Sequence, residues 1–329
     1  RIFHISIFMA LLSAQFILVN PADAGSVDAS LAASYGFDEG SGATAKDASG
    51  NNYNGTITGA SWTAGKISSG ALSFNGTGDY VSIPRMNYDE ITVSAWFYRN
   101  SADTANADAI LGGWRWNSDT QLQEGIELRF PINSNILQFT AVTRNSIGTK
   151  TQKTASKDLV ISTGSWYHAA GTYNKTSGEQ KLYINGLLAA TQTHPLGNTI
   201  VPLTNSSYPD MRIGHSRINS GYFNGKIDDV RIYYQALKEE LIADLYNLAN
   251  ANTAPAVESF SSIGITKDSA ILNAKVNPNC LDTAIWFEYG RDKGSLTYKS
   301  LTQQATGCRD TFISIPVSSL SDNTTYYYR

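Results

Sequence analysis

The sequence lacks any concentration of charge of one sign. Only 16% of its 329 residues are charged, the formal net charge is -3, and no basic block occurs. Nucleic acids and anionic membranes attract proteins through clustered lysine and arginine, so the composition argues against both as partners. Cysteine is also scarce, with two residues and no neighbouring pair of histidines, which argues against a structural zinc site.

The one long apolar run is shorter than a membrane span. Residues 5–19 (ISIFMALLSAQFILV) follow a basic N-terminus, whereas a spanning helix needs about 20 apolar residues. Ala22 and Ala24 then match the small-residue pattern of signal-peptidase sites. We therefore predict a signal peptide over residues 1–24, no membrane insertion after its cleavage, and a mature protein that is secreted or held at the cell surface. A buried core helix or a membrane anchor is the alternative.

Glycine, with 27 residues, and tyrosine, with 18, are abundant. From residue 25 to about residue 250, short apolar runs alternate with turns of Gly, Asn, Asp and Ser. No helical segments of about 10–15 residues separate these runs, so they predict antiparallel strands in a sandwich or barrel. We expect strands at 71–74, 79–83, 91–98, 125–130, 136–142, 166–173 and 181–184.

Two local signals are sharper than the rest. Asn185 and Gly186 stand between apolar runs and predict a two-residue hairpin, because both central positions of a type I′ turn need positive φ. Leucines recur at every fourth position within residues 236–247, which predicts one amphipathic helix at the end of the first domain.

A second β pattern follows a small, polar linker over residues 251–256 and occupies residues 257–329. Its last apolar run has no successor, so we expect the sequence to stop inside this domain and further domains of the same polypeptide to follow. Cys280 and Cys308 lie in it, 28 positions apart. A disulfide is expected in an exported chain, with two buried thiols as the alternative.

Several segments together resemble laminin-G-like, concanavalin A-like jelly-roll modules. They begin within residues 31–84, with LAASYGFDEGSG and GALSFNGTGDYVSIP. ITVSAWFY, GSWYHAAGTYN, KLYINGLLAAT and GKIDDVRIYYQALKEELIADLY follow in the order of that family. The resemblance covers about residues 31–247 and implies an antiparallel jelly-roll sandwich over residues 25–250.

The C-terminal segments AILNAKVNPNCLDTAIWFEYG and LSDNTTYYYR resemble a bacterial fibronectin type III module. Leu320, Thr324 and Tyr326 stand at positions resembling its tyrosine corner. The predicted fold is therefore all-β: a jelly roll followed by an incomplete immunoglobulin-like, fibronectin III sandwich.

The strand GKIDDVRIY (225–233) raises the question of what neutralises its acids. Strict alternation places Asp228 on one face with Val230 and Ile232, and an unpaired charge there is expensive. The jelly-roll resemblance implies a structural calcium ion that ties the N-terminal segment to this strand, with Asp38, Asp47 and Asp228 as ligands. Carboxylates suit calcium, and a chelator should then lower the melting temperature.

Two alternatives to calcium stay open at this point. Asp47 and its neighbours are also typical turn formers, whose side chains accept hydrogen bonds from nearby backbone N–H groups. Asp228 is also compatible with a β-bulge in which neighbouring amides satisfy its carboxylate.

Aromatic residues suggest a place for a ligand. In LGGWRWNSD (111–119), Trp114 and Trp116 alternate around Arg115, and Tyr222 lies in a loop rich in Gly and Asn. Aromatic faces stack on sugar rings while a few polar groups orient the hydroxyls. We predict these four residues as ligand-binding, with ordinary core packing of the two tryptophans as the alternative.

No catalytic residues are predicted. Glycosidases need two carboxyl groups about 5–9 Å apart, and the spacing of Glu124 and Glu127 sends them to opposite faces of a strand. Neither His194 nor His215 stands in a recognisable triad.

We therefore predict an exported, non-enzymatic binding module that recognises carbohydrate or another cell-surface ligand. It would form the N-terminal part of a larger multidomain protein, with a role in cell adhesion. A glycoside hydrolase on the same fold and a purely structural spacer or adhesin segment are the alternatives.

Overall fold

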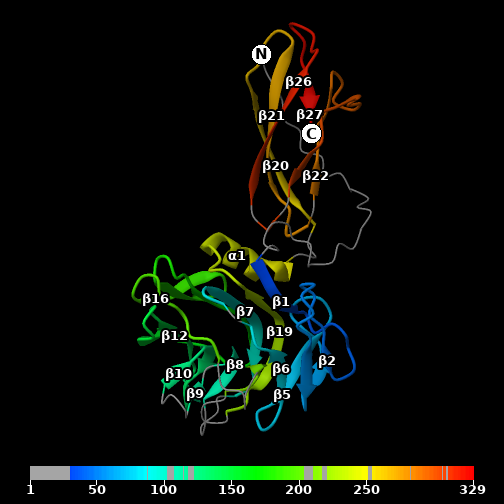
Figure 1. Ribbon diagram of the computed structural model, residues 1–329. Coiled ribbons are helices and arrows are strands. Elements are labelled where there is room, and N and C mark those ends of the chain that lie inside the picture. Colours follow the sequence, from blue (N-terminus) through cyan, green and yellow to red (C-terminus); the bar gives the residue numbers. More distant parts are fainter. Residues whose placement is uncertain are drawn as a thin grey trace. The chain divides into compact units, whose positions relative to one another are not determined.

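The computed structural model describes residues 30–86, 88–101, 107–113, 115–117, 122–203, 210–216, 221–250, 254–281, 283–305, 307–308 and 310–329. The predicted signal peptide lies outside these residues. Contacts divide the chain into two compact units, one spanning Val27–Tyr246 and the other containing Asn247–Arg329 (Figure 1). No helix among the described residues is long and apolar enough to cross a membrane.

In the described residues, the first unit contains two antiparallel sheets, which we name sheet A and sheet B. Sheet A consists of β1 (Leu31–Tyr35), β4 (Ser61–Thr63), β5 (Ala71–Asn75), β7 (Ile91–Arg99), β14 (Trp166–Tyr173), β15 (Glu179–Ile184), β16 (Leu187–Thr193) and β19 (Asn224–Tyr233). The strands follow the order β16-β15-β14-β7-β19-β5-β4, and β1 also pairs with β19. Strands that are distant in sequence, such as β7 and β19, are neighbours in this sheet.

Sheet B consists, in the same part of the chain, of β2 (Thr44–Ala45), β3 (Gly55–Thr58), β6 (Tyr80–Pro84), β8 (Asp108–Gly112), β11 (Ile126–Phe130), β12 (Ile136–Arg144), β13 (Lys150–Val160), β17 (Thr199–Ile200) and β18 (Asp210–Ile213). Their order is β13-β12-β11-β8-β18-β6-β3-β2, with β17 beside β12. Strands β9 (Arg115–Asn117) and β10 (Leu122–Glu124) pair with each other as a separate two-stranded hairpin. The predicted antiparallel jelly-roll sandwich is confirmed.

The core lies between the two sheets, because alternate side chains of each strand point inward. Val93 and Phe97 of β7 share one buried cluster with Leu128 and Phe130 of β11. The rings of Phe97 and Phe130 meet edge to face, with centroids 5.7 Å apart. Each sheet is left with one outer face, and the residues on these outer faces are available for other roles.

The two sharp local predictions also hold. Asn185 and Gly186 have φ of 51° and 76° and join β15 to β16 as a two-residue hairpin. Helix α1 (Glu239–Asn247) falls within the predicted residues 236–247. Its Tyr246 stacks on Trp96, on the outer face of sheet A, with ring centroids 5.5 Å apart.

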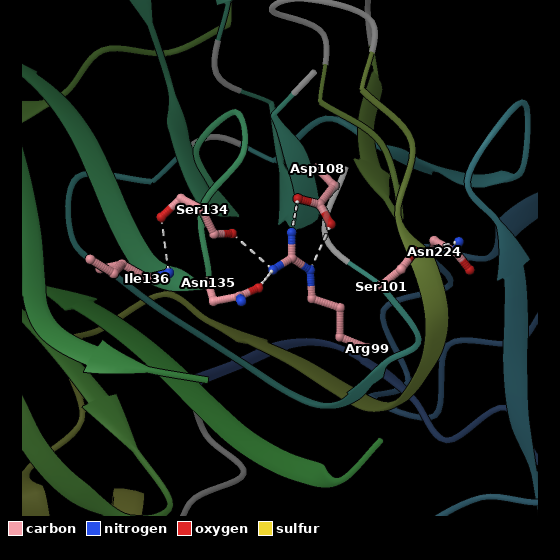
Figure 2. Close-up of polar contacts among 7 residues, drawn as sticks. All are labelled: Arg99, Ser101, Asp108, Ser134, Asn135, Ile136 and Asn224. Carbon is pink, nitrogen blue, oxygen red and sulfur yellow. Dashed lines mark hydrogen bonds and ion pairs between the residues drawn. The ribbon is translucent and has the colours of Figure 1, made fainter. Parts of the chain in front are cut away.

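A buried ion pair fixes the end of β7 (Figure 2). The Arg99 guanidinium donates to both carboxylate oxygens of Asp108, at 3.0 and 2.9 Å. It also donates to the Ser134 carbonyl at 2.9 Å and to Asn135 Oδ1 at 2.7 Å. The guanidinium lies 4.0 Å from the centroid of the Phe130 ring. Both charged side chains are fully buried, and nothing in the sequence signals that they pair.

The second unit is also built from antiparallel strands. They are β20 (Ala256–Ile263), β21 (Ser269–Asn277), β22 (Thr283–Ile285), β23 (Glu288–Gly290), β24 (Tyr298–Lys299), β25 (Gln303–Ala305), β26 (Thr311–Ser318) and β27 (Tyr327–Tyr328). Leu272, Phe287 and Ile315 belong to its separate core. A disulfide joins Cys280 to Cys308, and the Tyr326 hydroxyl accepts a hydrogen bond from the Ser321 N–H at 3.1 Å.

Candidate ligand-binding face of sheet B

Strand β19 does not alternate through its two acids. The register against β7 slips between Asp228 and Arg231, and Asp229 has a φ of 45°. This β-bulge adds one residue, so three apolar side chains all reach the core: Ile227, Val230 and Ile232. The expectation that Asp228 shares a face with the last two of them is therefore wrong.

Two of the predicted calcium ligands instead hold one early loop, residues 65–70. Asp228 Oδ2 accepts two of its backbone N–H groups, at 2.7 and 2.8 Å. Asp38 Oδ1 accepts two more, at 3.0 and 2.8 Å. The loop passes so close to residue 37 that a Cβ on Gly70 would lie 2.0 Å from the Phe37 carbonyl oxygen. Hydrogen bonds from backbone N–H groups of loop 65–70 to Asp228 therefore hold this early loop against strand β19.

Asp47, the third predicted ligand, shapes its own turn. Its carboxylate accepts the backbone N–H groups of Ser34 and Ser49 at 2.9 Å and of Tyr53 at 3.0 Å. A cation needs oxygen ligands where these three carboxylates meet N–H donors. Among the described residues, no group of three or more His, Cys, Asp or Glu side chains is placed to hold a metal ion. These hydrogen bonds hold the three acids without an ion, and a shared calcium ion stays a prediction of the family resemblance.

The effect of a chelator tests this conclusion. Because backbone N–H groups already bind both oxygens of Asp47 and one oxygen each of Asp38 and Asp228, we expect saturating EDTA to leave the melting temperature of the chain unchanged within about 1 °C. Differential scanning calorimetry with and without added calcium measures this directly. A fall of several degrees in EDTA, restored by calcium, would instead support the metal that the family resemblance implies.

The structure describes only part of the four predicted ligand-binding residues. Trp114 lies outside the described residues, as do the side chains of Arg115 and Trp116, whose backbone forms β9. Tyr222 is described: it is half-buried and forms an isolated bridge with His215. Of the four predicted residues, only Tyr222 has a described side chain, and the residues around it on sheet B define the candidate site.

One row of residues crosses the outer face of sheet B, at right angles to the strands. Arg212 of β18 is in register with Gly112 of β8, which is in register with Glu127 of β11. Register partners project on the same side of a sheet. The sequence neighbours Ile213 and Leu128 belong to the core cluster, so Arg212 and Glu127 point outward.

Gly112 gives Glu127 its position. A Cβ built on Gly112 would lie 2.9 Å from Glu127 Cγ and 2.6 Å from the carbonyl oxygen of Ile126. The Glu127 side chain therefore lies across β8, in the direction of β18. A larger residue at position 112 would displace it.

Glu127 is a buried acid on this face. Its exposed fraction is 1%, and burial raises the pKa of its carboxyl to about 8, although Arg129 and a hydrogen bond with Ser216 act to lower that pKa. The Nε of Arg129 lies 3.7 Å from Glu127 Oε2. With a pKa of about 8, the carboxyl is mainly protonated at neutral pH.

Aromatic rings and a guanidinium stack beside this row. The Arg212 guanidinium lies 3.9 Å from the centroid of the Tyr80 ring, and its Nε donates to Asp210 Oδ2 at 3.2 Å. Its Nη1 lies 3.2 Å from Nδ1 of His215. The His215 ring packs on Tyr222, with centroids 4.3 Å apart. We name Tyr80, Arg212, His215 and Tyr222 the Arg212 stack.

The argument that Glu124 and Glu127 lie on opposite faces does not apply, because Gly125 between them has a φ of 81° and interrupts the extended strand. The Glu124 carboxylate lies 4.0 Å from Lys150 Nζ. Each of the two acids is therefore placed beside a cation of its own.

Sequence reasoning identified only Tyr222 of the Arg212 stack. Tyr80 and Arg212 lie on strands that are distant in sequence. Neither segment alone indicates that the two strands pair, or in which register. The available signal was the alternation of polar and apolar residues in DMRI, the residues of β18.

A family model described as the concanavalin A-like lectin/glucanases superfamily matches residues 75–243. A search of curated proteins found no match. Among solved structures, domain 4 of a GH43 extracellular arabinanase from Geobacillus stearothermophilus, in complex with arabinotriose, is 22% identical, with 66% of this chain and 98% of that chain covered and a TM-score of 0.48. The receptor binding domain of botulinum neurotoxin C/D mosaic serotype is 15% identical, with coverages of 81% and 75% and a TM-score of 0.49.

Proposed function

Because the chain belongs to the concanavalin A-like lectin/glucanases superfamily, we propose that it is a non-catalytic binding module that recognises carbohydrate on the outer face of sheet B. The Arg212 stack is the observation that supports this proposal most. The half-buried rings of Tyr80 and Tyr222 offer flat apolar faces to a sugar, and the half-buried Arg212 guanidinium offers N–H groups for the hydroxyls. The buried His215 ring holds Arg212 and Tyr222 in place.

The polar groups around the stack are already oriented. Asp210 accepts a hydrogen bond from Arg212 at 3.2 Å, and the Ser82 hydroxyl donates to the same carboxylate at 2.7 Å. Ser82 and Arg212 are also register partners on β6 and β18. Side chains that are fixed in advance lose little conformational entropy when a ligand binds, which favours recognition by this face.

Binding is favoured over hydrolysis because the two nearby acids have cationic neighbours. Glu127 lies beside Arg129 and Glu124 beside Lys150, whereas a glycosidase aims two carboxyl groups at the bond it cleaves. One observation favours a hydrolase as the second candidate: a buried acid whose pKa is raised to about 8 resembles a general acid. Release of reducing ends from a glycan, abolished by Glu127→Gln, would establish that second candidate.

The wider context is part of the same proposal. We place the module in an exported, multidomain protein, with the second β unit as a fibronectin III-like spacer. This placement is supported by the signal-peptide pattern before residue 25 and by the family resemblance of residues 257–329.

Substitutions in the Arg212 stack test the proposed site. We expect Arg212→Ala and Tyr80→Ala each to weaken glycan binding at least about tenfold, because a tenfold change is only about 1.4 kcal/mol and hydrogen bonds to charged groups contribute about 1.5–3 kcal/mol. A panel of arabinan, xylan, galactan and glucan oligosaccharides, followed by isothermal titration calorimetry on the full chain, measures the loss.

The controls are matched in residue type. Arg329→Ala and Tyr298→Ala alter exposed residues of the second unit and should leave binding unchanged. Wild-type affinity in a folded Arg212→Ala variant would reject this face as the site. Binding of no glycan by the wild-type chain would favour the spacer alternative.

A further inference from the structure

The outer face of sheet A carries its own row of aromatic and cationic side chains. Trp166 of β14 and Lys226 of β19 are both in register with Tyr98 of β7, one on each side. The two rings meet edge to face, with centroids 5.8 Å apart. Lys226 Nζ lies 5.6 Å from the centroid of the Tyr98 ring. All three side chains are half-buried, so part of each is open to solvent.

A second lysine lies beside this row. Lys66 is exposed, and its Nζ lies 5.2 Å from the ring of Trp96. Trp96 precedes Tyr98 by two residues on β7 and points to the same face, about 7 Å along the strand. The Lys66 backbone N–H is bound to Asp228, which is two residues from Lys226. The hydrogen bond therefore places Lys66 next to the row.

The charge beside the Tyr98 row comes from Lys66 and Lys226 and is positive. No ion pair of Lys66 or Lys226 occurs within the described part of the chain. Asp228 is fully buried and bound to the amides of loop 65–70. Asp229 is 4% exposed and lies 3.0 Å from Arg231. Neither acid is placed to neutralise the lysines from the solvent side.

Uncharged polar groups stand at the end of the row. Asn100 Nδ2 donates to Asn224 Oδ1 at 3.1 Å, and Asn224 Nδ2 donates to Ser101 Oγ at 3.0 Å (Figure 2). Asn224 precedes Lys226 by two residues on β19. Asn100 and Ser101 are exposed and Asn224 is half-buried, and their amide and hydroxyl groups have the chemistry that sugar hydroxyls need.

We infer that Tyr98, Trp166, Lys66 and Lys226 form a second binding site, on the sheet opposite the Arg212 stack, for an acidic sugar. Its ring packs on the two aromatic side chains, and its carboxylate or sulfate pairs with the two ammonium groups. An uncharged sugar satisfies only the aromatic half of this surface. The inference is independent of the proposed site on sheet B, because no residue is shared.

The test uses two acidic probes and one neutral probe. Trigalacturonate carries carboxylates, its methyl ester lacks their charge, and a heparin-derived tetrasaccharide carries sulfates. We expect the full chain to bind at least one acidic probe, more weakly as salt rises, and to bind the methyl ester at least tenfold more weakly than trigalacturonate if the carboxylate is the group recognised. Titration calorimetry at low salt measures each affinity.

Variants locate the site. Lys66→Gln combined with Lys226→Gln should lower acidic-sugar affinity at least tenfold, and Tyr98→Ala should lower it as well. Lys157→Gln, at an exposed lysine of sheet B, is the matched control and should have no effect. Arg212→Ala should also leave acidic-sugar binding unchanged, while it weakens glycan binding at the proposed site.

Three results would overturn the inference. They are the absence of binding to both acidic probes, wild-type affinity in the double lysine variant, and loss of acidic-sugar binding in Arg212→Ala alone. The last of these would move the acidic ligand to sheet B and would leave the proposed function standing.

Discussion

Replacing Arg99 with alanine is expected to lower the free energy of unfolding of the first unit by about 3–5 kcal/mol, the usual cost of removing one partner from a buried ion pair. Both side chains of the Arg99–Asp108 pair are fully buried. The variant removes the guanidinium that balances the Asp108 charge, and it leaves the Ser134 carbonyl without the hydrogen bond that Arg99 donates (Figure 2).

Urea denaturation followed by tryptophan fluorescence measures the effect. Every tryptophan except Trp286 precedes residue 247, so the signal reports mainly on the first unit. The double variant Arg99→Met/Asp108→Leu should be less destabilised than Arg99→Ala, because no charge is left buried. Lys175→Gln, which breaks an exposed ion pair with Asp89, should have far less effect. A loss below about 1 kcal/mol in Arg99→Ala would contradict the account of this pair.

The second large effect is a pH dependence that comes from Asp228. The pKa of its carboxyl is raised from 3.8 to about 7, because burial and the nearby Asp229 charge raise it by more than the hydrogen bonds from the loop amides lower it. The folded state therefore holds this proton more tightly than the unfolded state does. The stability that it contributes is complete below about pH 4 and is lost as the pH rises through about 7.

Asp228→Asn separates this group from the others that titrate, because asparagine keeps a carbonyl oxygen for the loop amides and has no proton to lose. We expect the stability of the wild-type chain relative to Asp228→Asn to fall by at most about 4 kcal/mol between pH 4 and pH 8. Urea titrations at intervals of one pH unit measure the difference. A difference that is constant across this range would show that Asp228 does not titrate as described.

Glu127 gives the same sign of pH dependence at higher pH, since burial raises the pKa of its carboxyl to about 8. Glu127→Gln should therefore remove a loss of stability centred higher than the one that Asp228→Asn removes. The two variants together distinguish an acid held on sheet A from an acid held on sheet B.

Local sequence rules predicted the parts of the fold that depend on neighbouring residues. The hairpin at Asn185 and Gly186 follows from the positive φ of a two-residue turn, and helix α1 follows from the spacing of its leucines. The bulge at Asp228 and Asp229 could be given only as an alternative, because strict alternation cannot detect one extra residue in a strand. The structure shows that Asp228 Oδ2 accepts backbone N–H groups of loop 65–70.

The candidate site was harder to predict because it depends on register between distant strands. Tyr222 was identified from its loop, but its relation to Tyr80 and Arg212 exists only after β6 and β18 pair. The buried Arg99–Asp108 pair is of the same kind, since it joins β7 of sheet A to β8 of sheet B. Composition and periodicity contain no information on such pairings.

Residue-resolved NMR of the full 35.7 kDa chain, titrated with an uncharged oligosaccharide that binds, tests the central claim most directly. A sugar that packs on the Arg212 stack should shift the backbone amide signals of β6, β18 and β11, together with those of His215 and Tyr222. The signals of the second unit should stay in place. Shifts confined to the second unit, or no shifts with any sugar of the panel, would contradict the assignment of carbohydrate recognition to the outer face of sheet B.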